Sequence, residues 1–72
     1  MKIILYTLPT CSICNMVKTK LNQMNLLFEE RDFRKITTKI NSEYAPALEI
    51  INDEKSIIYN NPSQIVNWIN QQ

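Results

Sequence analysis

Two cysteines three positions apart, Cys11 and Cys14, are the only cysteines in the 72-residue chain. They follow an apolar run and open a segment with helical periodicity. In the first turn of a helix, residues i and i+3 lie about 5–6 Å apart, a separation that a disulfide spans without backbone movement. The N–H groups and the dipole at a helix N-terminus also stabilise a thiolate, which lowers the pKa of a cysteine below about 8.5. The spacing predicts a redox pair with Cys11 as the nucleophile and Cys14 as the resolving thiol.

Length and charge limit what else the chain can do. Its length fits one small domain, residues 1–72. The net charge is +1 with acidic and basic residues interleaved, so no extended field favours nucleic acid or an anionic membrane. With no histidine and no third cysteine, one chain cannot complete a zinc site. We expect a monomer that holds no metal and no resident cofactor.

The residues before the cysteine pair bear on location. The apolar run from Met1 to Tyr6 is too short for a signal-peptide core or a membrane span. We therefore expect a cytoplasmic protein. In a reducing compartment, a lone pair of close cysteines is more often catalytic than structural.

The hydrophobic pattern places the cysteine pair between a strand and a helix. Residues Lys2–Thr7 are apolar on both faces, which predicts a central strand covered on each side. Residues Ser12–Asn25 predict a helix whose apolar positions recur at Ile13, Val17, Leu21 and Met24. Leu27–Phe33 predicts a second strand, which a right-handed crossover would pair in parallel with the first.

The second half of the chain predicts a short helix and a hairpin. Arg34–Asn41 carries apolar residues at helical spacing and should end before residue 44. Ala47–Ile51 and Ser56–Tyr59 are strand-like runs joined by the turn residues Asn52–Lys55. Because the chain has no glycine, its turns depend on Asn, Asp, Ser and Pro.

A last helix should begin at Pro62, with Asn60 or Asn61 as its N-cap. Its apolar positions are Ile65, Trp68 and Ile69, which we expect to be buried. We also expect Met16 and Met24 to fill gaps in the core. The predicted order is βαβαββα, an α/β fold.

Pro46, just before the predicted third strand, is the second informative position. A cis Ala45–Pro46 bond would be affordable there and would present the backbone of Ala45 to an extended substrate as an added strand. From the spacing alone, an ordinary trans proline at the turn is the simpler interpretation.

Three segments, in this order, resemble the glutaredoxins. They are Leu5-Tyr6-Thr7 leading into Cys11-x-x-Cys14, Tyr44-Ala45-Pro46 before a strand, and Asn60-Asn61-Pro62-Ser63 opening the last helix. The resemblance implies a thioredoxin fold, with a four-stranded mixed sheet flanked by three helices and a cis Pro46. It implies a dithiol oxidoreductase that reduces protein disulfides or glutathione mixed disulfides, with glutathione as co-substrate. The residues that it places at the substrate or glutathione site are Tyr6, Ser12, Ile13, Ala45, Pro46, Asn61 and Ser63.

The chain departs from this pattern where glutathione would bind. Leu8 stands where the family usually has a lysine, three residues before the first cysteine. Asn60-Asn61 replaces a Gly-Gly pair, and Ser63 and Gln64 replace acidic residues. Backbone N–H groups at the start of the last helix could still hold a carboxylate of glutathione.

These departures bring in a related group that the chain also resembles, the redoxins that thioredoxin reductase reduces and that donate electrons to ribonucleotide reductase. The Ser12-Ile13 pair between the cysteines fits that group. The group's aromatic-Ser-Gly-Phe-Arg-Pro segment is absent before Pro62. Two further hypotheses are a non-catalytic thioredoxin-fold binding module and a subunit-bridging iron–sulfur cluster held by Cys11 and glutathione.

Overall fold

A four-stranded mixed sheet organises the computed structural model, which describes residues 1–36 and 45–72. The strands are β1 (Lys2–Thr7), β2 (Glu29–Asp32), β3 (Ala47–Asn52) and β4 (Lys55–Tyr59), in the spatial order β2-β1-β3-β4. β1 pairs in parallel with β2, and the β1–β3 and β3–β4 pairs are antiparallel. The predicted interior position of β1, its parallel pairing and the hairpin are therefore confirmed.

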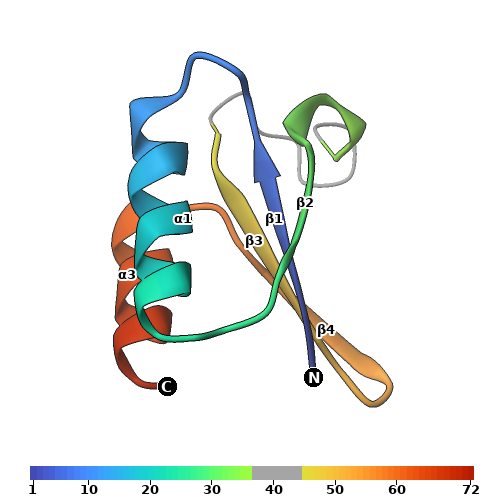
Figure 1. Cartoon of the computed structure of the whole chain (residues 1–72). Coiled ribbons are helices and arrows are strands. Elements are labelled where there is room, and N and C mark those ends of the chain that lie inside the picture. The colour runs from blue at the N-terminus through green and yellow to red at the C-terminus, as the bar shows by residue number, and fades with distance from the viewer. Residues whose placement is uncertain (37–44) are drawn as a thin grey trace.

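Two α-helices, α1 (Ser12–Gln23) and α3 (Pro62–Asn70), lie on one side of the sheet (Figure 1). Their buried side chains meet alternate strand residues in one hydrophobic cluster. That cluster contains Ile3, Leu5, Val17, Leu21, Leu48, Ile50, Ile65 and Ile69. The other strand residues face a second cluster, formed by Ile4, Tyr6, Phe33, Ile36 and Ala47. This alternation explains why β1 is apolar on both faces.

The buried face of α1 differs from the predicted one. It consists of Cys14, Val17 and Leu21. Met16 and Met24, which we expected to fill gaps in the core, are exposed, as is Ile13. Ile13 lies about 100° around the helix from Cys14, outside the stripe that Cys14, Val17 and Leu21 form. The helix also ends at Gln23, two residues earlier than expected.

The second predicted helix, Arg34–Asn41, is only partly covered by the described residues. The described residues at its start belong to a short 3-10 helix, η1 (Phe33–Lys35), where the Asp32 side chain accepts a hydrogen bond from the Arg34 N–H. Residues 37–44, with the rest of the predicted helix, lie outside the described residues. Within residues 1–36 and 45–72 there are thus two α-helices, where the sequence predicted three.

Asparagine and aspartate make the tight turns of this glycine-free chain. Asn25, after α1, has φ 57°, and Asp53, in the β3–β4 turn, has φ 56°. These residue types tolerate the left-handed region best after glycine. Asp53 lies in the predicted turn, whereas Asn25 was not predicted. No helix in the described parts of the chain is long and apolar enough to cross a bilayer.

Candidate active site at the start of α1

Cys11 and Cys14 form a disulfide at the N-terminus of α1. Their Cα atoms are 5.2 Å apart, as the first turn of a helix predicts. Cys11 is the N-cap residue, and its Sγ accepts a hydrogen bond from the Cys14 N–H, with a N–Sγ distance of 3.1 Å. A sulfur in this position is stabilised as a thiolate once the disulfide is reduced.

The two sulfur-bearing residues differ in accessibility. Cys14 is 1% exposed, whereas Cys11 is only partly buried. An incoming substrate can therefore reach Cys11 but not Cys14. The roles of Cys11 as the nucleophile and Cys14 as the resolving thiol stay a prediction, which this difference in accessibility supports.

The end of β1 holds the cysteine loop in place. β1 is bonded on both sides, to β2 and β3, so its last residue has a fixed position. The Cys11 N–H donates to the Leu8 carbonyl, and the Asn15 N–H donates to the Cys11 carbonyl, both at 3.3 Å. The loop thus turns directly from the strand into the helix.

Pro46 lies at the same end of the sheet as the cysteine loop. The Ala45–Pro46 peptide is cis, as the resemblance implied. Ala47, the next residue, pairs with Tyr6 near the end of β1. The Asn60 Nδ2 group donates to the Pro46 carbonyl at 3.0 Å and ties this turn to the start of α3. Tyr44, which precedes the turn, lies outside the described residues.

Asn61 is the N-cap of α3, one of the two predicted alternatives. Its Oδ1 atom accepts a hydrogen bond from the Ser63 N–H at 2.8 Å. That N–H is therefore already occupied, so it does not stand free for a ligand carboxylate. Both side chains are exposed.

Comparison with known proteins identifies the family. The family model described as Glutaredoxin matches residues 3–53, which include the cysteine pair and the cis proline. The chain belongs to the glutaredoxin family. No curated protein sequence matches it.

A solved structure supports the fold of this glutaredoxin. TDR1 from Leishmania, a trimeric glutathione transferase, is similar over 96% of this chain, with a TM-score of 0.74 and 16% sequence identity. This chain covers 17% of the length of that protein. At this identity the likeness shows a shared thioredoxin-like fold.

Tyr6, predicted at the substrate site of the glutaredoxin, lies instead in the core. It belongs to the hydrophobic cluster with Phe33, on the side of the sheet opposite α1. Its hydroxyl donates to Oε1 of Glu49 at 2.8 Å. Burial, together with this hydrogen bond, raises the pKa of Tyr6 above 10.0. Glu49, a buried carboxylate on β3, was not singled out from the sequence, although a glutamate within an apolar strand was a visible signal.

The remaining predicted site residues lie on the first turn of α1 and in the turn before β3, at the same end of the sheet. Ser12 and Ile13 are exposed on the first turn of α1, and Ala45 is half-buried beside the cis proline. One end of the sheet of this glutaredoxin thus carries Cys11 and Cys14, the two residues between them, and the Ala45–Pro46 turn.

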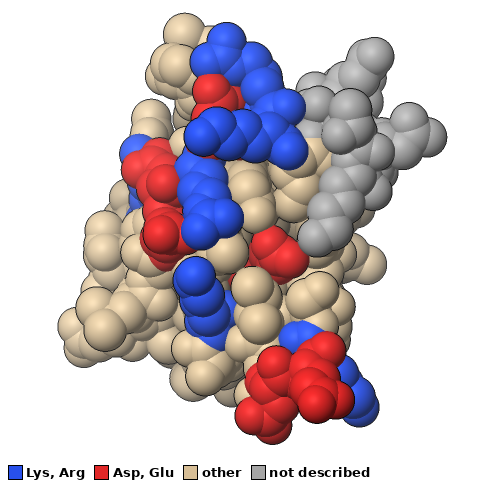
Figure 2. Space-filling view, turned by 90° about the vertical axis from the view of Figure 1, so that its right-hand side faces the viewer, with Lys and Arg blue, Asp and Glu red and all other residues tan. Residues whose placement is uncertain are grey.

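Charged residues gather beside the cysteine loop on the β2 side. Figure 2 shows basic side chains close to acidic ones on the face that carries β2 and η1. Lys18 Nζ lies 3.2 Å from Glu30 Oε2. The Thr7 hydroxyl also donates to Glu30 at 2.6 Å, and this hydrogen bond is the main cause of the lowered pKa of Glu30. These residues line a pocket of about 380 Å³ with Leu8, Pro9, Asn15, Arg31 and Asp32.

Replacing Arg34 by methionine should raise the pKa of Asp32 from about 2 towards 3.8. Hydrogen bonds from the Arg34 side chain and backbone hold this pKa down, and the variant keeps only the backbone one. Because the folded-state pKa is depressed, the pair stabilises the fold above pH 4 and loses that effect as the pH falls through 2. The exposed pair should change stability little. A carbon-13 NMR titration of the Asp32 carboxyl measures the shift.

The control for this titration is Lys55→Met, which removes a cation from the β3–β4 hairpin. It should leave the pKa of Asp32 unchanged, because the hydrogen bonds from Arg34 remain. An Asp32 that titrates near 3.8 in the unmodified protein would contradict the ion pair.

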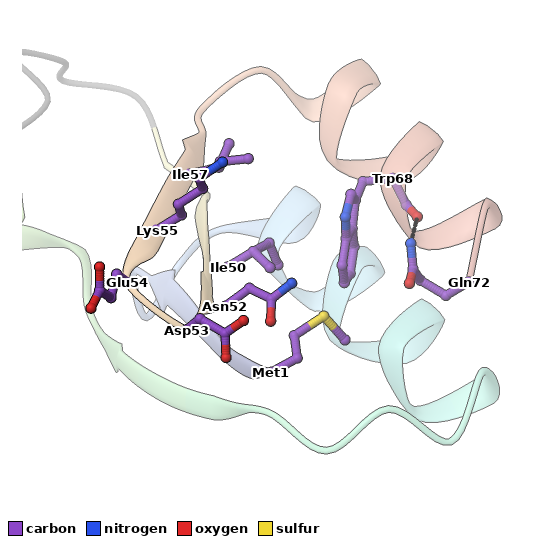
Figure 3. A pocket seen from close by; sticks show the side chains of 9 residues that line it. All are labelled: Met1, Ile50, Asn52, Asp53, Glu54, Lys55, Ile57, Trp68 and Gln72. Atoms are coloured by element: carbon purple, nitrogen blue, oxygen red, sulfur yellow. Dashed lines mark hydrogen bonds between the residues drawn. The ribbon is translucent and has the colours of Figure 1, made fainter.

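A larger pocket, of about 650 Å³, lies at the opposite end of the sheet, between the β3–β4 turn and the end of α3 (Figure 3). Trp68 and Ile50 form part of its apolar wall, and Asn52 and Asp53 stand on its polar side. None of the predicted site residues lines it. Its size therefore does not mark it as the reactive centre of the glutaredoxin.

Proposed function

We propose that this member of the glutaredoxin family is a dithiol thiol–disulfide oxidoreductase that acts in the cytoplasm, with glutathione as its co-substrate. The observation that carries the proposal is the asymmetry of the Cys11–Cys14 pair. One sulfur is accessible at a helix N-terminus, and the other is buried within bonding distance of it. A bridge that only stabilised the helix would need no accessible member.

The reaction transfers two electrons to the substrate. The Cys11 thiolate attacks one sulfur of the substrate disulfide, the substrate S–S bond breaks, and the other substrate sulfur leaves as a thiolate. Cys14, deprotonated, then attacks Cys11 Sγ and releases the second substrate sulfur. The products are two substrate thiols and the oxidised Cys11–Cys14 pair. Two glutathione thiols return the pair to the dithiol and become glutathione disulfide.

The geometry supports the first step in particular. The Cys14 N–H points at Cys11 Sγ at 3.1 Å, so it can donate to the sulfur anion of the reduced protein. Hydrogen bonds to an ionised acceptor are about twice as strong as neutral ones. The same donor also stabilises Cys11 as the leaving sulfur when the pair is reduced again.

A coupled assay tests the proposal. The protein is given a disulfide substrate, NADPH, glutathione and glutathione reductase, and we expect NADPH to be consumed in proportion to the protein. A parallel reaction replaces glutathione and its reductase by thioredoxin reductase.

The parallel reaction tests a second candidate, a redoxin reduced by thioredoxin reductase that supplies ribonucleotide reductase. The occupied Ser63 N–H, where a glutathione carboxylate could have bound, favours this candidate. Consumption only in that reaction would move the assignment to it. Consumption in neither reaction would overturn the oxidoreductase and leave the binding module.

A further inference from the structure

The wall of the site on the α3 side carries no charge. Residues 3–17 and 56–72 contain no Asp, Glu, Lys or Arg. The first turns of α1 and the whole of α3 are therefore uncharged. On the β2 side, by contrast, three cations are held in ion pairs, namely Lys18–Glu30, Arg31–Glu29 and Arg34–Asp32. The nearest charged side chain on this face of α1 is a cation, Lys20, so a cationic substrate group would find no counter-ion on α3 or on the first turns of α1.

The uncharged wall contains a groove of about 300 Å³ between α1 and α3. Its lining residues are Met16, Pro62, Ser63, Val66 and Asn67. Met16 is 43% exposed, and Ile13, three residues earlier on the same face of α1, is 41% exposed. Apolar surface thus runs from between the two cysteines into the groove. Exposed apolar surface beside a polar rim can serve as a contact site, and this surface lies next to the reactive cysteine.

We propose that this groove receives an uncharged apolar side chain of the substrate polypeptide, close to the half-cystine that Cys11 attacks. This inference rests on the proposed function and names its substrate class: peptide and protein disulfides with apolar flanking residues. Met16 lies five residues beyond Cys11, about 7.5 Å along the helix axis. An extended peptide advances about 3.3 Å per residue, so the second or third residue from the half-cystine reaches the groove.

We expect the groove to disfavour a charged substrate side chain. A lysine in the groove would lose water without gaining a hydrogen-bonded counter-ion, which is unfavourable. The next charged residue of α1 on this face is Lys20, one turn beyond Met16, and it would repel a second cation. A leucine would bury apolar surface against Met16 and Val66 without such a loss.

The test uses two disulfide peptides with blocked termini. One peptide has leucine, and the other has lysine, at the second position on each side of the half-cystine; the peptides are otherwise identical. The pre-reduced protein is mixed with each peptide, and the second-order rate of Cys11–Cys14 oxidation is followed by acid quenching and thiol alkylation. We expect the leucine peptide to react about 10–100-fold faster, the range for one apolar contact.

Two variants locate the preference in the groove. Met16→Glu and Val66→Glu should each slow the leucine peptide and speed the lysine peptide, so that most of the preference is lost. Glu at position 16 can pair with Lys20 at i,i+4, which favours the helix. Gln23→Glu adds the same charge to the exposed last turn of α1 and should keep the preference.

A small disulfide without flanking residues, bis(2-hydroxyethyl) disulfide, distinguishes failure of the proposed function from failure of the proposed substrate class. The unmodified protein and Gln23→Glu should reduce it at similar rates. If the unmodified protein does not reduce it, the proposed function fails. If it does, but the leucine and lysine peptides react equally or both groove variants keep the preference, the substrate class proposed for the groove is wrong.

Discussion

Cys11→Ser should abolish disulfide reduction, with activity below about 0.1% of the unmodified protein, because a serine hydroxyl remains protonated and cannot replace the thiolate nucleophile. Cys14→Ser should behave differently. Its Cys11 can still attack the substrate, but no second sulfur within reach can release the product. This variant should accumulate a mixed disulfide and turn over only when an external thiol resolves it.

Intact-mass spectrometry under denaturing conditions distinguishes the two variants. After incubation with a peptide disulfide, Cys14→Ser should gain the mass of one peptide half, and Cys11→Ser should gain none. Each variant is the matched control of the other, since both remove one sulfur from the same turn and both prevent the disulfide. Equal loss of activity in both, with the adduct on neither, would contradict the assigned roles.

Patterns among neighbouring residues predicted most of the strands, turns and helix caps. The both-faced apolar pattern placed β1 inside the sheet, and its predicted bounds match the structure. A two-residue turn at Asp53 and Glu54 joins β3 and β4 as the turn chemistry indicated. Asn61 caps α3 directly before Pro62. These features depend on neighbouring residues, which a sequence displays directly.

Features that depend on distant residues were not predictable in the same way. The Tyr6–Glu49 hydrogen bond joins residues 43 positions apart, and it exists only because the β1–β3 register brings them to one face of the sheet. The ion pair of Lys18 with Glu30 likewise requires α1 and β2 to be docked. The sequence around each residue indicated at most whether it is buried and did not identify its partner.

In the candidate site, too, features set by neighbouring residues were predicted and features set by packing were not. The spacing of Cys11 and Cys14 predicted their disulfide, because residues three apart are neighbours in one helical turn. The predicted burial of Met16 and Met24 was wrong. The spacing of apolar residues shows that a helix has an apolar stripe, but it does not show which side of that stripe faces the sheet, particularly when a buried cysteine belongs to it. That orientation matters for function, because it turns apolar surface towards the substrate instead of towards the sheet.

Leu21→Ala should lower the free energy of unfolding by about 2–5 kcal/mol, the range for a buried leucine. Leu21 is fully buried, at 0% exposure, in the cluster between α1, α3 and the sheet. A chain of this length has a stability of about 4–11 kcal/mol in total. The substitution should therefore remove a large fraction of it, because the cavity opens where α1 meets the sheet.

Leu27→Ala is the matched control, since it makes the same chemical change at a side chain that is 93% exposed. It should alter the stability by less than about 0.5 kcal/mol. Urea titrations of the oxidised proteins, followed by the fluorescence of the single, partly buried Trp68, measure both changes. A loss at position 27 as large as at position 21 would mean that leucine acts through the unfolded chain. A loss confined to position 21 would mean that packing under α1 holds the helix, and with it the cysteine pair, against the sheet.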